Sequence, residues 1–258
     1  MNTLYMIEIK LNLKNVLQYV YHQEMLKRGD EDLGYALHVW LKAAFQDIAP
    51  KPWRLLVDER RPSRLLAYSL YDGESLKEAL LQFADPSASA AVEEFDEDIQ
   101  SKKMPIIKKG TRLGFELFAA PVGRKARSGV EKDYFLLKID QMQEHSKGEP
   151  HLQKTMTREE AYHDWLKHRL EKDGSATLHQ ASLDGFRLVK MHRRTQRYNT
   201  NGQEERHSSQ LVRPQVLLRG ELSVNDEDKF QHLLLSGVGR HTAFGYGMLL
   251  LRPPQKYK

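Results

Sequence analysis

The sequence predicts an α+β protein in which the order β-α-β-β-α-β occurs twice along the chain. Short segments with alternating apolar residues are typical of strands, and segments with apolar residues three and four positions apart are typical of amphipathic helices. These segments follow one another in the same order in both halves. The 258 residues suffice for two domains of about 100 to 150 residues each. We therefore predict two tandem domains, over 1–109 and 110–258, each with the ferredoxin-like topology that RNA recognition modules also use.

The N-terminal half begins with an alternating strand over 3–12. Helical spacing then predicts a helix that starts at Leu13 and stops at Gly29, and a second helix over 33–48 that acidic residues 30–32 cap and Pro50 ends. The other elements expected in this half are strands over 53–57 and 65–70 joined by a charged loop, a helix over 76–83 and an edge strand over 99–107.

The C-terminal half repeats this order. We expect, in turn, a strand over 113–121, a helix over 159–170, strands over 183–193 and 216–224, a helix over 226–235 and a last strand over 248–251. A polar insertion over 122–156 follows the first of these strands, and we expect it to be a loop with one short helix over 134–142.

Composition excludes several classes of protein. The chain is 40% hydrophobic and 29% charged, as in ordinary globular proteins, and no apolar run approaches the ~18 residues that span a bilayer. An early acid and the lack of a long apolar core at the N-terminus argue against a signal peptide. The absence of cysteine excludes disulfides, thiolate zinc sites and cysteine nucleophiles. These features predict a cytoplasmic protein.

Positive charge is concentrated in two segments. Residues 102–127 hold eight Lys or Arg and one Glu, and residues 187–213 hold seven Lys or Arg and two Glu, although the net charge of the whole chain is only +5. Such segregation is expected for a protein that binds a polyanion, whereas the alternative is a solvated basic surface.

A glycine-rich loop over 237–247 leads into the last strand. The residues that predict its function are Gly237, Gly239, Arg240, His241, Gly245 and Gly247. The glycines can adopt positive φ and let the backbone approach an anion, and the basic pair lies between them, so the loop predicts a site for a phosphate backbone. On spacing alone the glycines could equally be turn formers. The loop is neither a Walker loop nor a dinucleotide fingerprint, because a strand and not a helix follows it.

Tyr35 and His38 are candidate catalytic residues. They lie three positions apart in the second predicted helix, so both can face one phosphate. Histidine can exchange protons with an RNA 2′-hydroxyl or a 5′-leaving oxygen, and a tyrosine hydroxyl can donate to the charge that develops on the phosphorus oxygens. The alternative is that His38 caps the core face of the helix. Tyr19 with His22 repeats the same spacing, and His241 is a third candidate.

A basic arm over 187–207 is expected to form a hairpin with its tip at 199–202. The arm residues predicted to touch RNA phosphates are Lys190, Arg193, Arg194 and Arg197. No metal site is expected, because no His-Glu-x-x-His occurs and His163, Asp164 and His168 lack a closing ligand. A Gly-x-Ser-x-Gly signature of a serine nucleophile is also absent from the sequence.

Three stretches together resemble one family, the CRISPR repeat-processing endoribonucleases of the CasE type. The loop Gly237-Val-Gly-Arg-His-Thr-Ala-Phe-Gly-Tyr-Gly247 fits the wider superfamily's pattern of Gly-apolar-Gly, five residues that include a base, and Gly-x-Gly. Residues 218–226 are similar to the strand and helix start that precede this loop in CasE proteins, and residues 162–166 are similar to their central helix. The resemblance covers nearly the whole chain.

The resemblance places the family's catalytic Tyr-x-x-His on Tyr35 and His38. It implies a metal-independent endoribonuclease without a cofactor that cuts precursor RNA at the base of repeat hairpins, leaving a 2′,3′-cyclic phosphate and a 5′-hydroxyl. The implied partners are the repeat hairpin RNA and the other subunits of a type I-E Cascade complex, with no membrane. The extra helical segment over 13–28 leaves His22 as a rival. A hairpin-binding or structural subunit without catalysis is the alternative function.

Overall fold

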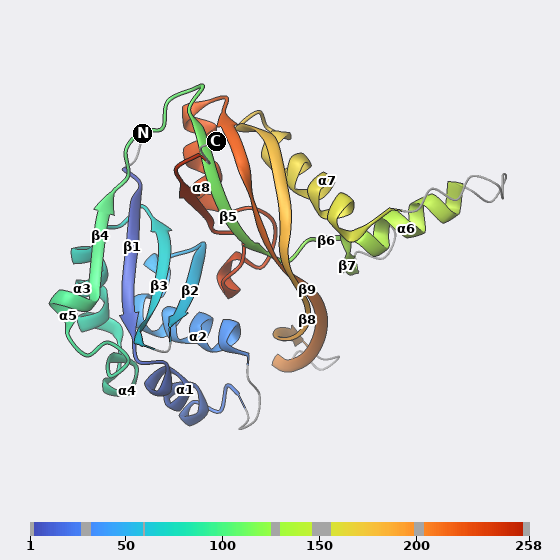
Figure 1. Cartoon of the computed structure of the whole chain (residues 1–258). Helices are drawn as coiled ribbons and strands as arrows, with labels where there is room; N and C mark the ends of the chain where they lie inside the picture. The colour runs from blue at the N-terminus through green and yellow to red at the C-terminus, as the bar shows by residue number, and fades with distance from the viewer. Residues whose placement is uncertain are drawn as a thin grey trace.

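The structure is a computed structural model that describes residues 3–26, 32–58, 60–124, 130–145, 156–198 and 204–254, with the backbone alone for 145, 191–198 and 204–211. Figure 1 shows two β-sheets side by side, the N-terminal sheet on the left and the C-terminal sheet in the middle. One helix, α6 (Tyr134–His145), projects to the right, away from both sheets. The described part of the chain therefore consists of two sheet-and-helix units and one protruding element.

The N-terminal sheet is antiparallel, with the strand order β2-β3-β1-β4. Its strands are β1 (Tyr5–Leu11), β2 (Trp53–Asp58), β3 (Arg61–Ser69) and β4 (Ile99–Lys103). Alternate residues of β1, Ile7, Ile9 and Leu11, are buried in the N-terminal hydrophobic core. The alternation that predicted this strand therefore separates a core face from the opposite face.

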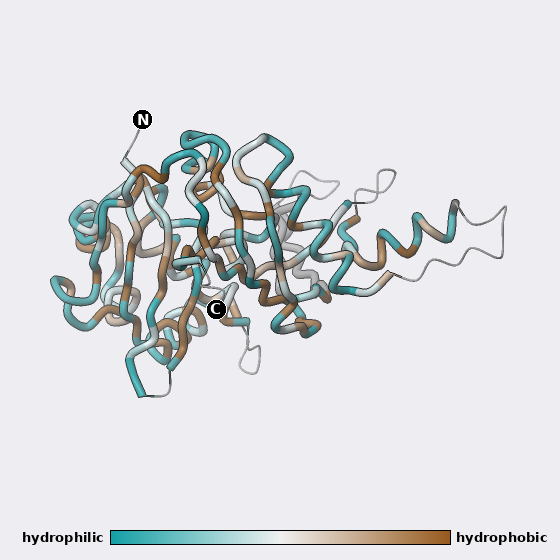
Figure 2. Tube along the Cα trace, turned by 45° about the horizontal axis from the view of Figure 1, so that its top comes forward, coloured by the Kyte–Doolittle hydropathy of each residue, from teal (hydrophilic) through white to brown (hydrophobic). Residues whose placement is uncertain are grey.

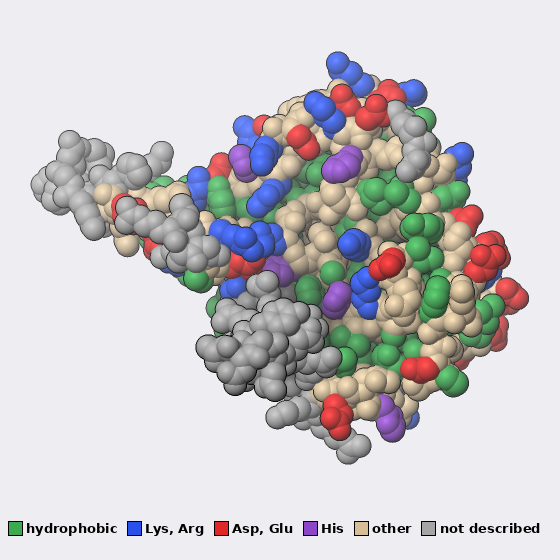
Figure 3. Space-filling view, turned by 180° about the vertical axis from the view of Figure 1, so that it is seen from behind, with side chains coloured by type: hydrophobic (Ala, Val, Ile, Leu, Met, Phe, Trp, Pro, Cys, Tyr) green, Lys and Arg blue, Asp and Glu red, His purple; other side chains and the backbone are tan. Residues whose placement is uncertain are grey.

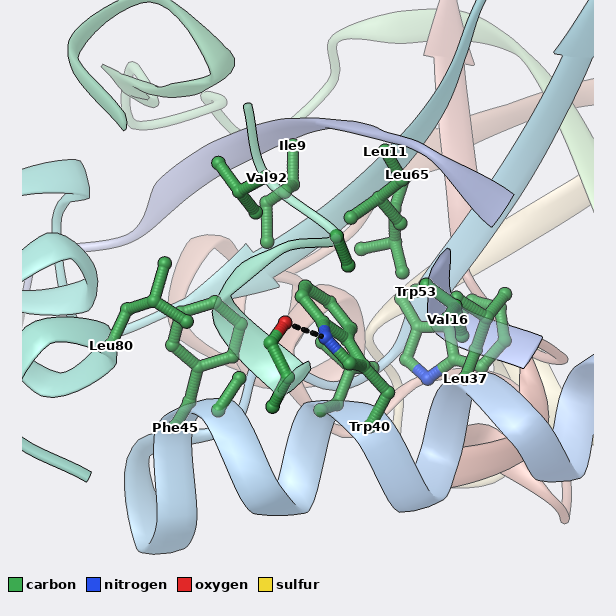
Figure 4. Packing of buried hydrophobic residues seen from close by; sticks show 14 of the residues in the cluster. Ile9, Leu11, Val16, Leu37, Trp40, Phe45, Trp53, Leu65, Leu80 and Val92 are labelled. Carbon is green, nitrogen blue, oxygen red and sulfur yellow. Dashed lines mark hydrogen bonds between the residues drawn. The ribbon is translucent and has the colours of Figure 1, made fainter. Parts of the chain in front are cut away.

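The helices of this half are α1 (Leu13–His22), α2 (Leu33–Phe45), α3 (Gly73–Phe83) and the one-turn α4 (Pro86–Ser89) and α5 (Phe95–Asp98), with a 3-10 turn η1 (Gln46–Ile48) after α2. Asp32 caps α2, its side chain accepting from the backbone N–H of Tyr35 at 2.9 Å. Trp40 is fully buried, and its indole N–H donates to the carbonyl of Ala88 at 2.8 Å (Figure 4). This packing fixes the rotation of α2 about its own axis, and so determines which of its residues face away from the core.

The C-terminal sheet is also antiparallel, with the strand order β10-β5-β9-β8. Its strands are β5 (Arg112–Ala119), β8 (Ala176–Tyr198), β9 (Glu204–Val224) and β10 (Leu249–Arg252), and its helices are α7 (Arg158–Glu171) and α8 (Glu227–Ser236). Counted along the chain, both sheets place the first strand between the third and the fourth. This is the ferredoxin-like arrangement, so the predicted tandem fold is confirmed.

Strands β8 and β9 are longer than predicted. β8 begins at Ala176 and β9 at Glu204, and the register between them shifts at Leu178/Gln180 and at Leu183/Gly185. Each bulge moves the following residues to the other face of the strand, so a simple alternation cannot be followed through the sequence. Figure 1 shows the far half of this hairpin curling beneath the C-terminal sheet, and β8 contacts α2. The predicted tip at 199–202 lies outside the described residues.

Other boundaries differ by a few residues. α1 ends at His22, short of the predicted Gly29, because Gln23 already leaves the helix and Glu24 has a positive φ of 53°. β3 begins at Arg61, inside the predicted charged loop, where its first residues are exposed and tolerate charge. β4 ends at Lys103, ahead of Pro105.

The insertion contains more regular structure than predicted. Its helix α6 was expected, but the small antiparallel hairpin of β6 (Val122–Arg124) and β7 (Glu131–Asp133) was not. Asp133 pairs with Arg158 of α7 at 2.6 Å and accepts from the buried Tyr162 hydroxyl at 3.0 Å. The base of the insertion is therefore attached to the C-terminal domain through charged and polar contacts.

The two domains pack directly on each other. Leu4 and Tyr68 of the first half are buried in the core of the second, and the Tyr68 hydroxyl donates to the carbonyl of Leu249 at 2.9 Å. Burial raises the pKa of Tyr68 far above its usual value. Figure 2 shows apolar residues along the inner strands and hydrophilic residues at the outer turns. Among the described residues, no helix has the length and apolarity that a membrane crossing needs.

Candidate functional site

The glycine-rich loop begins where α8 ends, at Gly237, and runs to the start of β10. Its four glycines have φ values of 77°, 93°, 86° and 82°, which glycine adopts without strain. His241 has a φ of 64°, in the left-handed region, and precedes a 3-10 turn, η3 (Thr242–Phe244). The loop therefore follows a path that most side chains would strain.

The glycines of this loop face protein atoms. A Cβ added at Gly239 would lie 2.7 Å from the ring of Trp165, and one at Gly245 would lie 2.6 Å from the ring of Trp53. At Gly237 and Gly247 the nearest atoms, 2.8 Å away, belong to Thr242 and Val238 of the loop itself. The indole N–H of Trp53 also donates to the carbonyl of Ala243 at 3.1 Å. These contacts favour the interpretation that the glycines shape the loop, and close approach to an RNA backbone remains a prediction.

Arg240 and His241 contact a buried carboxylate. Arg240 Nε lies 2.6 Å from one oxygen of Glu131, whereas His241 Nε2 and Arg213 Nη2 lie 3.0 and 3.2 Å from the other. Burial disfavours the charged form of Glu131, but His241, Arg240 and Arg213 together outweigh it and lower the pKa of its carboxyl. Burial also lowers the pKa of His241, which Glu131 counteracts only in part. The predicted anion-binding residues thus already hold an internal anion, and their contact with RNA stays a prediction.

The same loop meets the other predicted site at Phe244. The His38 ring centroid lies 4.8 Å from that of Phe244, and Tyr35 stacks on Phe244 with 6.5 Å between centroids. Gly34 leaves room for this approach, because a Cβ there would lie 2.8 Å from the Phe244 carbonyl oxygen. Two stretches that the sequence marked separately, at opposite ends of the chain, therefore lie in contact.

The environment of His38 favours its neutral form. It is partly buried on α2, and burial, followed by the positive charges of Lys42 and Lys51, lowers the pKa of its imidazole below the usual 6.5. The neutral imidazole, which can accept a proton, therefore predominates at neutral pH. Tyr35 is 7% exposed, so it reaches solvent only at its edge.

The rival pair lies elsewhere. Tyr19 and His22, near the end of α1, line a hollow together with Asn15, Ser87 and Ala90. Burial and the nearby Asp85 raise the pKa of Tyr19. None of the residues of this hollow lines the cavity beside the glycine-rich loop. The geometry therefore favours His38 over His22 as the partner of that loop.

A cavity of about 330 Å³ lies between the domains, next to the loop. Lys190, on β8, lines it together with Arg54, Phe118, Phe244 and Tyr246. The other predicted arm residues, Arg193, Arg194 and Arg197, belong to β8, but their side chains are outside the described ones.

Part of the predicted basic charge is paired internally. Arg112 bonds Glu221, Lys108 lies 3.2 Å from Glu227, and Arg213 pairs with Glu131. Figure 3 nevertheless shows Lys and Arg side chains beside histidines in the middle of one face. Among the residues with described side chains, no group of three or more His, Asp or Glu is arranged to hold a metal ion.

The chain belongs to the class of proteins that have two ferredoxin-like domains in tandem, and its glycine-rich loop packs against the first of them. A family model described as CRISPR associated protein matches residues 4–253, and the chain belongs to this family. The predicted resemblance is thereby confirmed. No curated protein matches the chain.

Solved structures share the fold. One, of the CRISPR endoribonuclease Cse3 bound to 19 nt RNA, aligns with a TM-score of 0.61 and 20% identity over 97% of this chain and 100% of the other. Thermus thermophilus Cse3, bound to an RNA representing a pre-cleavage complex, aligns with a TM-score of 0.56 and 20% identity over the same shares. A chain of a CRISPR RNA-guided surveillance complex aligns with a TM-score of 0.50 and 17% identity, again over 97% and 100%.

Sequence reasoning missed Glu131 as the anchor of the loop, and we predict that Glu131→Gln destabilises the protein. The change leaves Arg213 and Arg240 without their counter-charge, which we expect to lower the free energy of unfolding by about 1 to 3 kcal/mol. Urea unfolding of both proteins measures the difference. Glu144→Gln, at an exposed position of the same insertion, is the control and should change stability little. If Glu131→Gln and Glu144→Gln have the same free energy of unfolding, the contacts of Glu131 contribute nothing to stability.

Proposed function

We propose that the chain is an endoribonuclease that cuts CRISPR precursor RNA at the base of repeat hairpins and so produces mature guide RNA. The observation that carries the proposal is the contact between His38 and Phe244, which joins the candidate acid-base group to the family's glycine-rich loop. The fold shared with Cse3 structures that contain RNA supports it.

The proposed reaction needs only proton transfers and the RNA itself. A base removes the proton of a 2′-hydroxyl, whose oxygen attacks the adjacent phosphorus while the bond from phosphorus to the 5′-oxygen breaks. An acid then protonates that 5′-oxygen, which leaves a 2′,3′-cyclic phosphate and a 5′-hydroxyl. His38 acts as the base or the acid, and Tyr35 positions it or the phosphate. The scheme calls for no metal ion, because His38 moves one of these protons and a water molecule or a second protein group moves the other.

The basic residues of the loop and the arm would hold the RNA. Lys190 is exposed and lies on the long β8–β9 hairpin, which contacts α2, the helix that carries His38. We propose that Lys190, Arg193, Arg194 and Arg197 bind phosphates of the repeat hairpin, and that Arg240 and His241 bind RNA beside the glycine-rich loop. Lysine and arginine contacts to phosphates give affinity that falls steeply with salt.

Incubation of a repeat hairpin RNA with the protein in excess EDTA tests this function. We expect one cut at the base of the stem, with a 2′,3′-cyclic phosphate on the 5′ fragment and a 5′-hydroxyl on the other. A substrate with a 2′-deoxy nucleotide just before the cut is the control and should stay intact, since it lacks the attacking group. Cleavage that requires added Mg²⁺, or that occurs on the deoxy substrate, would contradict the mechanism.

A non-catalytic role in a Cascade-like ribonucleoprotein is the second candidate. It is favoured by the likeness to a chain of a CRISPR RNA-guided surveillance complex. Both roles predict binding of the hairpin, and only the first predicts its cleavage. Tight binding without cleavage in the same assay would select the second.

A further inference from the structure

The cavity between the domains combines positive charge with aromatic surfaces. Its cationic residues are Arg54 of β2 and Arg187 and Lys190 of β8, its acidic residue is Asp32, and its aromatic residues are Trp53, Phe118, Phe244 and Tyr246. Both domains and the glycine-rich loop therefore contribute to one concave surface. Its volume of about 330 Å³ falls within the range of roughly 300 to 1,000 Å³ that is usual for small-molecule sites.

Arg54 is the least satisfied group in this cavity. Its guanidinium lies over the Phe118 ring, 4.0 Å from the centroid, and its side chain is only 15% exposed. Buried Nε and Nη1 of Arg54 have no hydrogen-bond partner among the described residues. Buried donors of this kind normally have partners, so the site is suited to an anion that would supply acceptors.

The carboxylate that pairs with Arg54, that of Glu116, is already shared. It lies 3.8 Å from Arg54, whereas Arg219 Nε and Arg252 Nη2 bond it at 2.9 and 2.6 Å. Burial lowers the pKa of Arg54, an effect that this carboxylate only partly opposes. With Arg54, Arg187 and Lys190 against Asp32 among the lining residues, positive charge is in excess at the wall of the cavity.

Arg187 and Tyr246, which also line the cavity, are both held in place by Gln215. With the amide of Gln215 oriented to satisfy both neighbours, its oxygen accepts from Arg187 Nη2 at 2.7 Å and its nitrogen donates to the Tyr246 hydroxyl at 3.0 Å. Tyr246 also stacks on Phe118, with 5.1 Å between centroids and 5° between planes. Flat aromatic faces beside cations are the surfaces that bind single-stranded nucleic acid, through stacking and phosphate contacts.

We infer that this cavity binds one unpaired nucleotide of the RNA that flanks the hairpin, its phosphate on Arg54 and Arg187 and its base against the aromatic wall. The inference rests on the proposed function. We assign the nucleotide to the single-stranded flank, because an unpaired base is free to leave its neighbours and stack on aromatic side chains, whereas a base in the stem is held by its partner. Phe244 lines the cavity and also contacts His38, so a nucleotide bound here lies next to the proposed cleavage centre.

Arg54→Met tests the inference, because it keeps much of the packing on Phe118 and removes the charge. Binding is measured by fluorescence anisotropy with two RNAs, the bare repeat hairpin and the same hairpin with single-stranded flanks. We expect Arg54→Met to weaken binding of the flanked RNA about tenfold and to leave the bare hairpin within about twofold. Arg219→Met is the control, since Arg219 also bonds Glu116 but does not line the cavity, and it should affect neither RNA.

A second variant keeps the test decisive if Arg54→Met fails to fold. Phe118→Leu removes the ring on which Arg54 and Tyr246 pack but stays apolar, and it should also weaken binding of the flanked RNA selectively. Equal loss on both RNAs, or no loss on either in a folded variant, overturns the inference. Binding of adenosine monophosphate that depends on Arg54, with no preference for flanked RNA, would overturn the assignment to RNA. If the wild-type protein binds neither RNA, the proposed function itself fails.

Discussion

His38→Ala is expected to slow RNA cleavage by a factor on the order of a hundred or more and to leave RNA binding nearly unchanged. General acid-base groups typically contribute at least that much to the rate, whereas the imidazole is small and adds little to a large polyanion interface. Single-turnover cleavage with enzyme in excess measures the rate, and anisotropy measures the dissociation constant. His22→Ala is the matched control, because His22 lies on the neighbouring helix in a separate hollow.

The pH dependence of cleavage distinguishes the two roles of His38. Its pKa is lowered below 6.5, chiefly by burial, so the imidazole stays neutral to a lower pH than an exposed histidine would. If His38 is the base, the rate should persist below pH 6.5 and fall only as the pH drops through the lowered pKa. If it is the acid, the rate should fall as the pH rises through that value.

Loss of cleavage in His22→Ala, with His38→Ala still active, would show that Tyr19 and His22 are the catalytic pair in place of Tyr35 and His38.

Gly245→Ala is expected to lower the free energy of unfolding by about 2 to 5 kcal/mol. The residue has a φ of 86°, where a Cβ costs roughly 1 to 2 kcal/mol. The added methyl would also lie 2.6 Å from the Trp53 ring, and such overpacking costs about 1 to 3 kcal/mol more. Urea denaturation measures the loss. Cleavage should slow as well, because a shift of Gly245 would also move the preceding residue, Phe244, which contacts His38.

Gly110→Ala is a close control for this variant. Gly110 has nearly the same φ, 83°, but an added Cβ would meet no atom within 4 Å. The difference between the two variants therefore isolates the contact with Trp53 from the backbone strain. If both variants lose the same stability, Trp53 moves aside freely and the loop is not held by its ring.

Most of the fold could be predicted because its core elements carry strong periodic signals. The alternating β1 and the capped α2 are predicted from local residues alone. The β8–β9 hairpin was predicted too short because two bulges interrupt its alternation. The β6–β7 hairpin was missed because its strands have three residues each and consist largely of charged side chains. Such short strands have no pattern of their own and depend on the domain beneath them.

The candidate site was predicted in parts. Tyr35, His38 and the glycine-rich loop follow from residue type and spacing, and their roles stay predictions. Phe244 was not singled out, because one aromatic residue among glycines carries no local signal for a contact with a distant histidine. Glu131 could not be found either, since it pairs with Arg240 across more than a hundred positions in the chain.

The same pairing changes what a substitution of Arg240 would report. Arg240 was predicted to contact an RNA phosphate, but in the structure its Nε lies 2.6 Å from Glu131. A loss of RNA affinity in Arg240→Ala would therefore need to be compared with its loss of stability. A loss of RNA affinity would support a direct phosphate contact only if the Arg240→Ala protein is folded and has a normal melting temperature.

The contact of residues 243–246 with Trp53 determines when the candidate site can form during protein synthesis. A ribosome produces His38 and Trp53 long before it produces Ala243 and Phe244, which cover them. During synthesis the contact between His38 and Phe244 cannot form until nearly the last strand emerges. We therefore expect a chain interrupted before residue 243 to carry the proposed catalytic side chain without catalytic activity. Such a nascent chain could not cut a transcript before its C-terminal domain was complete.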